Sequence, residues 1–287
     1  MTTPTWDPAQ YLRHADHRAR PFTDLLARVP DLPGDAPLIA DLGCGPGNVT
    51  ALLAARWPTA RITGYDNSVE MLDKARVEYA GPTAGGGSLD FAHADVRTWA
   101  PAQPYDLIIS NATLQWVPGH VERFGAWVDG LVPGGTFAFQ VPGNFDSPSH
   151  RLMRELAGSR GLTETLRHDD AVHTPEAYLA ALADLGCEVD AWETTYVHLL
   201  QGEDPVLDWV KGTGLRPLLT ALADDPKARD AFLAEYRAAL REAYPTGLHG
   251  TPFPFRRIFA VARRVPGLSG ARRVTRSDDS GVRNHWE

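Results

Sequence analysis

The chain has 287 residues, 43% of them hydrophobic and 22% charged, which is the balance of a folded protein with room for one large α/β domain and a cap. Its formal net charge of −8 argues against a nucleic-acid partner, because proteins hold such partners through a basic surface. The two cysteines, Cys44 and Cys187, are too few for a disulfide framework or an ordinary zinc site, so we expect no metal.

The N-terminal segment, residues 1–37, is predicted to hold a helix, and it is a candidate lid because Tyr11 and Arg20 precede the first strand. Its opening residues, MTTPTWDPAQ, lack the basic region and the apolar core of a signal peptide. The longest apolar runs are strand-sized and fall short of the roughly 20 residues that a membrane helix needs. We therefore expect a cytoplasmic protein that does not enter a membrane.

Residues 38–143 alternate between strand and helix patterns. Helical patterns cover 49–56 and begin again near 68, and a glycine-rich loop covers 81–87. Apolar, strand-like runs lie at 38–42, 61–65, 89–93, 105–110 and 137–141. This alternation predicts a mainly parallel sheet with helices on both faces.

The pattern changes after residue 143. Residues 144–264 are predicted to form a mostly helical cap, inserted before a closing pair of strands at 188–196 and 256–263. The helical runs lie at 153–157, 175–185, 205–210, 215–223 and 227–244. Residues 265–287 contain almost no apolar side chains, so we expect a disordered tail there.

A glycine loop joins the first strand to the first helix of this core. Gly43, Gly45 and Gly47 lack a Cβ atom, which allows a tight turn and a close approach of a ligand to the backbone. A dinucleotide-binding loop would need a further glycine at position 48, where Asn48 stands. The spacing therefore favours a nucleoside ligand without phosphates, although some loops of this kind are only turns.

Polar side chains follow the next three strands. Asp66 ends the second strand, where its carboxylate could accept hydrogen bonds from ribose hydroxyls. Asp95 follows the third strand, in place to receive an adenine amino group, and Asn111 ends the fourth. Any one of them could be an ordinary helix cap or loop residue. Four consecutive strands that end on polar groups at one sheet edge predict a nucleoside site in that crevice.

This arrangement resembles the class I methyltransferases, which implies a Rossmann-like sheet and S-adenosylmethionine as cofactor, with S-adenosylhomocysteine as product. The resemblance implies that Asp41 lies near the methionine ammonium and that the three loop glycines lie against the methionine part. It also implies that Asp66 binds the ribose, that Asp95 and Val96 hold the adenine, and that Asn111 touches the methionine end. Further adenosine contacts are expected from Asn67, Ser68 and Met71.

A closer resemblance covers residues 5 to 264. The segments that carry it are Trp6-Asp7-Pro8 with Tyr11-Leu12, residues 18–28, ADLGCGPGN, NATLQWV, GCEVDAWETTY, DWVKGTGLRP and FAVAR. They are similar to the trans-aconitate 2-methyltransferase family, which implies methylation of a carboxylate on a small polycarboxylic acid. The loop at 81–87, which we expect beside the adenosine region, and the polar tail depart from the family pattern.

An acid with three carboxylates demands cations, and arginine forks bind carboxylates in bidentate fashion. In the matching segments we expect Arg20, Arg216 and Arg257 to bind the substrate, with Trp116, Tyr178 and Tyr196 as further contacts and Tyr11 and His173 as positioning groups. Trp116 and Tyr178 could equally be core residues, and Thr174 beside His173 could be just a helix cap. A carboxylate is ionised at neutral pH, so we predict no indispensable proton-transfer residue.

Three alternatives stay open at this point. The same fold could act on another small acid or on a natural-product hydroxyl, for which His173 would be the base. A nicotinamide oxidoreductase is disfavoured by the failed glycine spacing at Asn48 and by the missing second nucleotide-binding half, and a non-catalytic nucleoside-binding module would bind without turnover. Nucleic-acid substrates are set aside, because Asn111-Ala112-Thr113-Leu114 lacks the Pro-Pro-aromatic sequence of the amino-methylating enzymes. We expect a small-molecule substrate and a monomer or weak homodimer.

Overall fold

The computed structural model describes residues 15–166 and 172–266, and the side chains of residues 15–18 are left out of the description. Tyr11 and residues 267–287 of the predicted tail therefore lie outside the described residues. Among the described residues, no helix is both long and apolar enough to cross a membrane.

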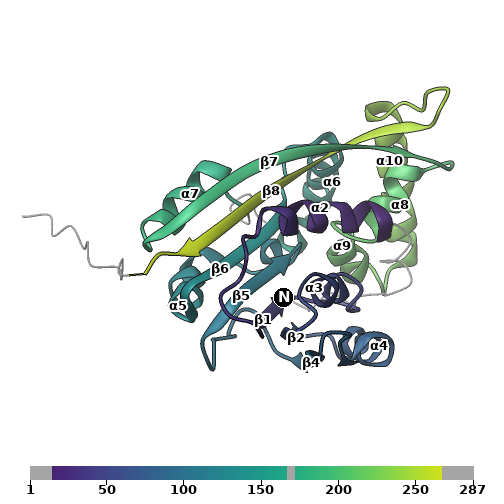
Figure 1. Cartoon of the computed structure of the whole chain (residues 1–287). Coiled ribbons are helices and arrows are strands. Elements are labelled where there is room, and N and C mark those ends of the chain that lie inside the picture. Colours follow the sequence, from purple (N-terminus) through teal and green to yellow (C-terminus); the bar gives the residue numbers. More distant parts are fainter. Residues whose placement is uncertain (1–14, 167–171, 267–287) are drawn as a thin grey trace, which may run out of the picture.

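One eight-stranded sheet organises the described chain (Figure 1), in the order β3-β4-β2-β1-β5-β6-β8-β7. Five strands run parallel to one another: β1, β2, β4, β5 and β6. Strand β3 is antiparallel to β4, and β8 is antiparallel to both β6 and β7. The bounds are β1 Leu38–Leu42, β2 Arg61–Asp66, β3 Gly81–Pro82, β4 Ser88–His93, β5 Tyr105–Asn111, β6 Leu131–Pro142, β7 Cys187–Leu200 and β8 Thr251–Arg264. This confirms the predicted Rossmann-like α/β fold.

Helices cover both faces of the sheet (Figure 1). Because successive strand residues point to opposite faces, Ile39 joins one core and Ala40 the other. The first core is closed by α2 (Ala15–Arg28), α3 (Thr50–Arg56) and α4 (Val69–Tyr79). The second is closed by α5 (Phe124–Asp129) and α7 (Pro175–Ala183). Residues 114–123, between β5 and α5, form two short 3₁₀ turns, η1 (Leu114–Trp116) and η2 (His120–Arg123).

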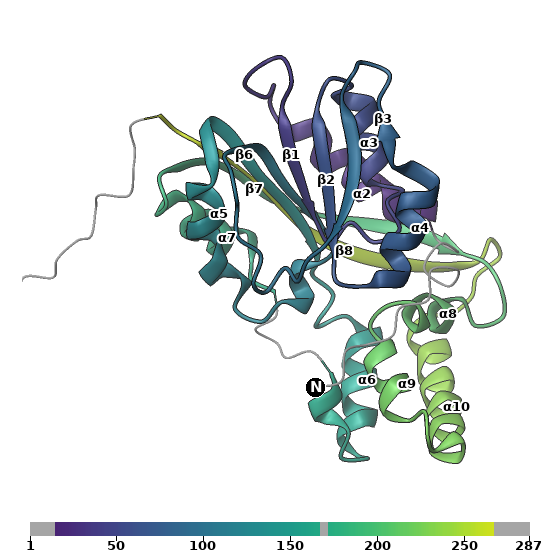
Figure 2. The same cartoon turned by 90° about the horizontal axis from the view of Figure 1, so that it is seen from below.

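The remaining helices form a cap beyond one end of the sheet (Figure 2). They are α6 (Pro148–Gly158), η3 (Thr163–Thr165), α8 (Pro205–Lys211), α9 (Arg216–Ala221) and α10 (Pro226–Ala243), and they share a third core. The cap differs from the expectation, because α8 to α10 lie between β7 and β8 and not before both strands. The long β7–β8 ladder allows this, since Leu200 and Phe253 at its far end pack into the cap core. The division of the chain at residue 143 stays a prediction.

The glycine-rich loop at 81–87 does not lie beside the expected adenosine region. Gly81 and Pro82 pair with the first residues of β4, and a Cβ on Gly87 would lie 2.1 Å from the carbonyl oxygen of Ala60, just before β2. The loop therefore lies at the amino-terminal edge of the parallel strands, opposite the edge that carries Asp66. The expectation was wrong because the turn folds back on residues 58–60 instead of continuing along the strand.

This placement predicts the effect of two loop variants. We expect Gly87→Ala to lower the free energy of unfolding by about 1–3 kcal/mol, because the new methyl group collides with a backbone oxygen. Gly86→Ala introduces strain at φ +88° without a collision and is the control. Neither should change the Kd for S-adenosylhomocysteine measured by calorimetry. Weaker binding in either variant would argue that this loop does reach the cofactor.

Candidate functional site

The glycine loop between β1 and α3 is bonded to the end of β2, because the backbone N–H groups of Gly43 and Cys44 donate to the carbonyl of Tyr65. All three loop glycines have positive φ, at +79°, +56° and +83°. A Cβ on Gly43 would lie 2.0 Å from Thr113 Oγ1, whereas one on Gly45 would meet nothing within 4 Å. Gly43 thus permits packing, and Gly45 leaves backbone open to a ligand.

Asp41 in β1 is a fully buried carboxylate behind this loop. Its Oδ2 accepts a hydrogen bond of 2.7 Å from Thr50 Oγ1, while Oδ1 has no hydrogen-bond partner among the described residues. Burial raises the pKa of Asp41 to about 7, although the Thr50 hydrogen bond opposes this rise and the charge of Asp66 adds to it. A buried carboxylate oxygen of this kind suits a cationic ligand group.

Asp66 at the end of β2 joins the glycine loop to α4. Its Oδ2 accepts from the N–H of Gly45 at 2.9 Å and its Oδ1 from the N–H of Ser68 at 2.9 Å. Burial raises the pKa of Asp66, and these backbone hydrogen bonds oppose the rise. Each carboxylate oxygen has further acceptor capacity, as ribose binding would require. Ser68 caps α4, and Asn67 beside it is exposed.

Asp95 follows β4 and is held by a neighbouring guanidinium. Arg97 Nε lies 3.0 and 2.9 Å from its two oxygens, and Nη2 lies 2.5 Å from Oδ2. The Arg97 side chain holds the pKa of Asp95 below its usual value. An adenine amino group would therefore have to share this carboxylate with Arg97. Val96, the residue after Asp95 in the chain, and Met71 of α4 are both buried, at 6% and 4% exposure.

The end of β5 is fixed by a relay of polar side chains across three strands. Asn111 Oδ1 accepts from Gln140 Nε2 at 2.5 Å, and Gln140 Oε1 accepts from Arg257 Nη1 at 3.3 Å. Ala112 has φ +54°, a conformation that costs a non-glycine residue about 1–2 kcal/mol. Gln115 Nε2 donates to the carbonyl of Ala112, and the N–H of Ala112 donates to the carbonyl of Gln140. These two hydrogen bonds hold the strained turn in place.

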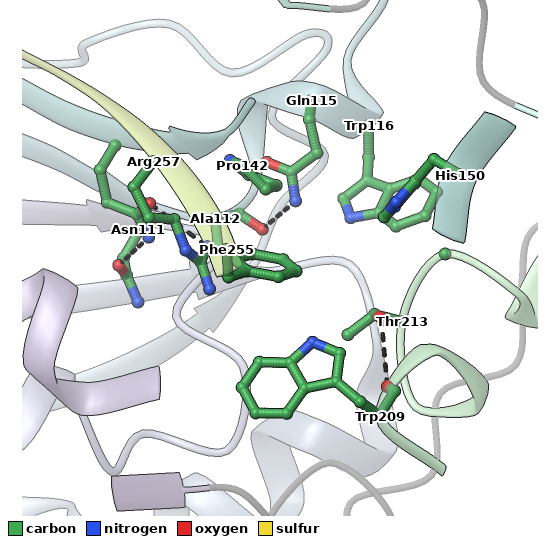
Figure 3. A pocket seen from close by; sticks show the side chains of 12 residues that line it. Asn111, Ala112, Gln115, Trp116, Pro142, His150, Trp209, Thr213, Phe255 and Arg257 are labelled. Atoms are coloured by element: carbon green, nitrogen blue, oxygen red, sulfur yellow. Dashed lines mark hydrogen bonds between the residues drawn. The ribbon is translucent and has the colours of Figure 1, made fainter. Parts of the chain in front are cut away.

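A pocket opens at this turn, between the sheet edge and the cap (Figure 3). Arg257 lies on its wall, only 6% exposed, with its guanidinium 4.6 Å from the centre of the Phe255 ring. Its lining is Asn111, Ala112, Gln115, Trp116, Gln140, Pro142, His150, Trp209, Thr213, Gly214, Phe255 and Arg257. Thr113, next to this lining, packs on Gly43, so the pocket and the glycine loop adjoin each other.

Some predicted substrate residues meet in this pocket and others do not. Trp116 and Arg257 line it, whereas Arg216 does not and only follows Gly214, which does. Tyr178 is fully buried in the core under α7, where its hydroxyl lies 2.8 Å from Nε2 of His120. Burial lowers the pKa of that histidine to about 4. His173 is exposed at the start of α7 and is outside the pocket lining.

Tyr196 and Arg20 contact each other and do not line the pocket. The Tyr196 hydroxyl donates to Asp24 Oδ2 at 2.6 Å, and the Arg20 guanidinium lies 5.1 Å from the centre of the Tyr196 ring. Tyr196 thus holds α2 against β7, and this contact places both residues between an N-terminal helix and the sheet.

The sequence-based expectations did not include several lining residues, among them Gln115, Gln140, His150, Trp209 and Phe255. Gln140 carried a signal, since it is a polar residue inside the apolar run FAFQV. Phe255 also carried a signal, because it lies two positions before Arg257 and therefore on the same face of β8. His150 and Trp209 carried none, because only the folded cap brings them together.

The open space at Gly45 predicts a specific loss in a variant. We expect Gly45→Ala to weaken S-adenosylhomocysteine binding at least tenfold, because its methyl group would occupy the seat of the ligand. Gly34→Ala is the matched control, with φ +79° and no atom within 4 Å, so it adds strain of about 1–2 kcal/mol only. Equal Kd values by calorimetry in the two variants would contradict this position for the ligand.

Comparisons with known proteins agree with this geometry. A family model described as a methyltransferase domain matches residues 39–135. Two solved structures share the fold at low identity. The Bacillus subtilis YcgJ protein is 14% identical with a TM-score of 0.52, over 88% of this chain and 100% of its own. A chain of the complex that contains the Haloferax volcanii Trm112 methyltransferase activator is 19% identical with a TM-score of 0.53, over 92% and 100%. At these identities the likeness shows the fold alone.

Curated relatives extend over almost the whole chain. A trans-aconitate 2-methyltransferase from Streptomyces avermitilis is 75% identical over 265 residues, which is 91% of this chain and 97% of the relative. One from Streptomyces coelicolor is 73% identical over 270 residues, or 93% and 89%. One from a Mycobacterium species is 49% identical over 266 residues, or 90% and 99%. The chain is therefore an S-adenosylmethionine-dependent methyltransferase that belongs to the trans-aconitate 2-methyltransferase family.

Proposed function

We propose that this chain transfers a methyl group to one carboxylate of trans-aconitate and releases a monomethyl ester and S-adenosylhomocysteine. The observation that carries the proposal is Arg257, a buried cation on the wall of the pocket that adjoins the glycine loop. A guanidinium in a dry site favours an anion beside it and can hold a carboxylate with two parallel hydrogen bonds. The names of relatives with 73–75% identity support trans-aconitate as that anion.

The residues at the glycine loop fit S-adenosylmethionine. The Oδ1 atom of Asp41 is a buried acceptor suited to the methionine ammonium, and Gly45 offers bare backbone beside it. Asp66 and Asp95 would take the ribose and the adenine, with Val96, Asn67 and Met71 around them. Gly43, Gly47 and Asn111 would complete the methionine end. A glycine loop without phosphate spacing agrees with a ligand that carries no phosphate.

In this reaction the protein has to orient the carboxylate and exclude water from it, and it does not have to transfer a proton. A carboxylate has a pKa near 4 and is ionised at neutral pH, so no residue has to remove a proton. When bound, the cofactor supplies an electrophilic methyl group on a sulfonium, which the carboxylate oxygen takes as the carbon–sulfur electron pair returns to sulfur. Arg257 would orient the acid, and Trp116, Trp209 and Phe255 would exclude water from it.

A hydroxyl acceptor is less well supported than a carboxylate. It would need a base, and His173, the candidate from the sequence, is exposed and does not line the pocket. The proposal also includes a small-molecule substrate without a nucleic-acid partner, which the net charge of −8 supports. A cytoplasmic location and a monomer or weak homodimer stay predictions.

Substitution of Arg257 tests the acceptor. We expect Arg257→Ala to raise KM for trans-aconitate about tenfold to a hundredfold, which corresponds to the loss of about 1.5–3 kcal/mol for a charged hydrogen bond. The Kd for S-adenosylhomocysteine should stay nearly unchanged. Arg256→Ala is the matched control, because Arg256 is bonded to the exposed Glu193 and does not line the pocket. An equal loss of both ligands in Arg257→Ala would indicate a structural role instead.

The raised pKa of Asp41 predicts a pH dependence of cofactor binding. The ionised form attracts the ligand ammonium, so S-adenosylhomocysteine should bind more weakly as pH falls below about 7, by up to tenfold per pH unit. In the ligand-free protein the neutral form is favoured, so the free energy of unfolding should fall as pH rises from about 4 to about 7. Calorimetric titrations between pH 5.5 and 8 measure the first effect. Asp41→Asn should flatten both profiles, and an unaltered binding profile would show that another group titrates.

A further inference from the structure

His150 is the second nitrogen-rich side chain on the pocket wall. It lies in the first turn of α6 and is only 6% exposed. Figure 3 shows Arg257 on one side of the pocket and His150, beside Trp116, on the other. The two residues come from different layers of the protein, since Arg257 lies on β8 and His150 on the cap.

The Nδ1 edge of His150 faces two serines that are not among the residues lining the pocket. Ser147 Oγ lies 3.1 Å and Ser149 Oγ 3.2 Å from Nδ1. Ser147 gives its own hydroxyl proton to the carbonyl of Asn144 at 2.7 Å, so toward the ring it is an acceptor. A proton on Nδ1 can therefore be donated to Ser147. The first turn of α6 is anchored from the end of α10, where the hydroxyl of Tyr244, the residue after that helix, accepts from the N–H of Ser149.

The Nε2 edge of His150 faces Gly214, which also lines the pocket. A Cβ on Gly214 would lie 3.2 Å from Nε2 and 3.6 Å from Cδ2, so the absent side chain leaves this edge room at the lining. Among the described residues, the charged group on the same lining is Arg257, and the titratable groups behind the first turn of α6 are the hydroxyls of Tyr236 and Tyr244.

We propose that His150 is a second anchor for the acceptor, which donates a hydrogen bond from Nε2–H to a carboxylate other than the one held by Arg257. This inference rests on the proposed carboxylate acceptor. With Nδ1 bonded to Ser147, the ring takes up a proton from solvent on Nε2 as the acid binds. Two cationic anchors on opposite sides of one pocket select acids that carry at least two carboxylates over monocarboxylic acids.

The anchor differs from a general base in the sign of its pH dependence. An imidazolium anchor loses its charge as pH rises, whereas the carboxylates of the acid stay ionised, so an anchor makes KM rise with pH while kcat stays flat. A base would instead make kcat fall as pH decreases. Saturation with S-adenosylmethionine keeps the titration of Asp41 out of the measurement.

Three variants of the full chain test the proposal by steady-state kinetics with trans-aconitate and with crotonate, a monocarboxylate. His150→Asn keeps an amide near the serines and removes the group that faces the pocket. We expect it to raise KM for trans-aconitate about tenfold to a hundredfold, with little change for crotonate and in the Kd for S-adenosylhomocysteine. His150→Gln places a neutral donor near the Nε2 position, so it should recover part of the affinity and abolish the pH dependence of KM. His249→Asn, in the exposed turn before β8, is the control.

The outcomes separate this inference from the proposed function. If the unaltered protein forms no ester from trans-aconitate, the proposed function fails, whatever the variants do. If it forms the ester but KM is unchanged in both His150 variants, the anchor is wrong. A low-pH loss of kcat that both variants remove would make His150 a base and would overturn the anchor as well. A parallel loss of cofactor affinity would assign His150 a structural role.

Discussion

The parallel register of β1 with its two neighbours is the constraint on which the rest of the site depends. Asp41 pairs with Gly64 of β2 on one side and Ile109 of β5 on the other. This register puts the ends of all three strands at one sheet edge, so the glycine loop meets the carbonyl of Tyr65 and the carboxylate of Asp66. A shift of one residue would turn each of these groups to the other face. The proposed cofactor site and the proposed acceptor pocket therefore lie at one sheet edge.

Two buried ionisable groups, Asp41 and Arg257, lie along this edge, and the charged form of each costs free energy to bury. Asp41 has one carboxylate oxygen without a hydrogen bond among the described residues, and Arg257 reaches Gln140 from a nearly closed wall. Removing charges from water costs free energy that a well-packed apolar residue would not cost. Such a cost is reasonable where ligands of opposite charge arrive, because the same low dielectric strengthens each new contact. Stability is thus lower in the empty protein than the packing would allow.

The glycine loop and the strand ends of the proposed donor half could be predicted from the sequence, because their signals are local. Glycines at every second position after an apolar strand, and an acidic residue at the end of the next strand, follow from backbone geometry alone. The acceptor half could not. Tyr178 and Tyr196 look like pocket residues in a one-dimensional pattern, yet the first bonds to His120 and the second to Asp24. His150 had no local signal, because its role depends on Gly214, which is 64 positions away in another piece of the cap. The loop at 81–87 was misplaced for a similar reason, since only its contact with Ala60 fixes the edge at which it lies.

The insertion of α8 to α10 between two paired strands also bears on how the family could change its substrate. Strands β7 and β8 are held together over fourteen pairs, while the chain between them leaves the sheet and returns. The entropy of closing such an excursion grows only with the logarithm of its length, by about 0.6 kcal/mol for each doubling. Helices in this excursion can therefore be lengthened, shortened or replaced at little cost to the sheet. Evolution could remodel the wall that carries Trp209 and Gly214, and with it the size of the acid that the proposed pocket accepts, without disturbing the strand ends proposed to hold the methyl donor.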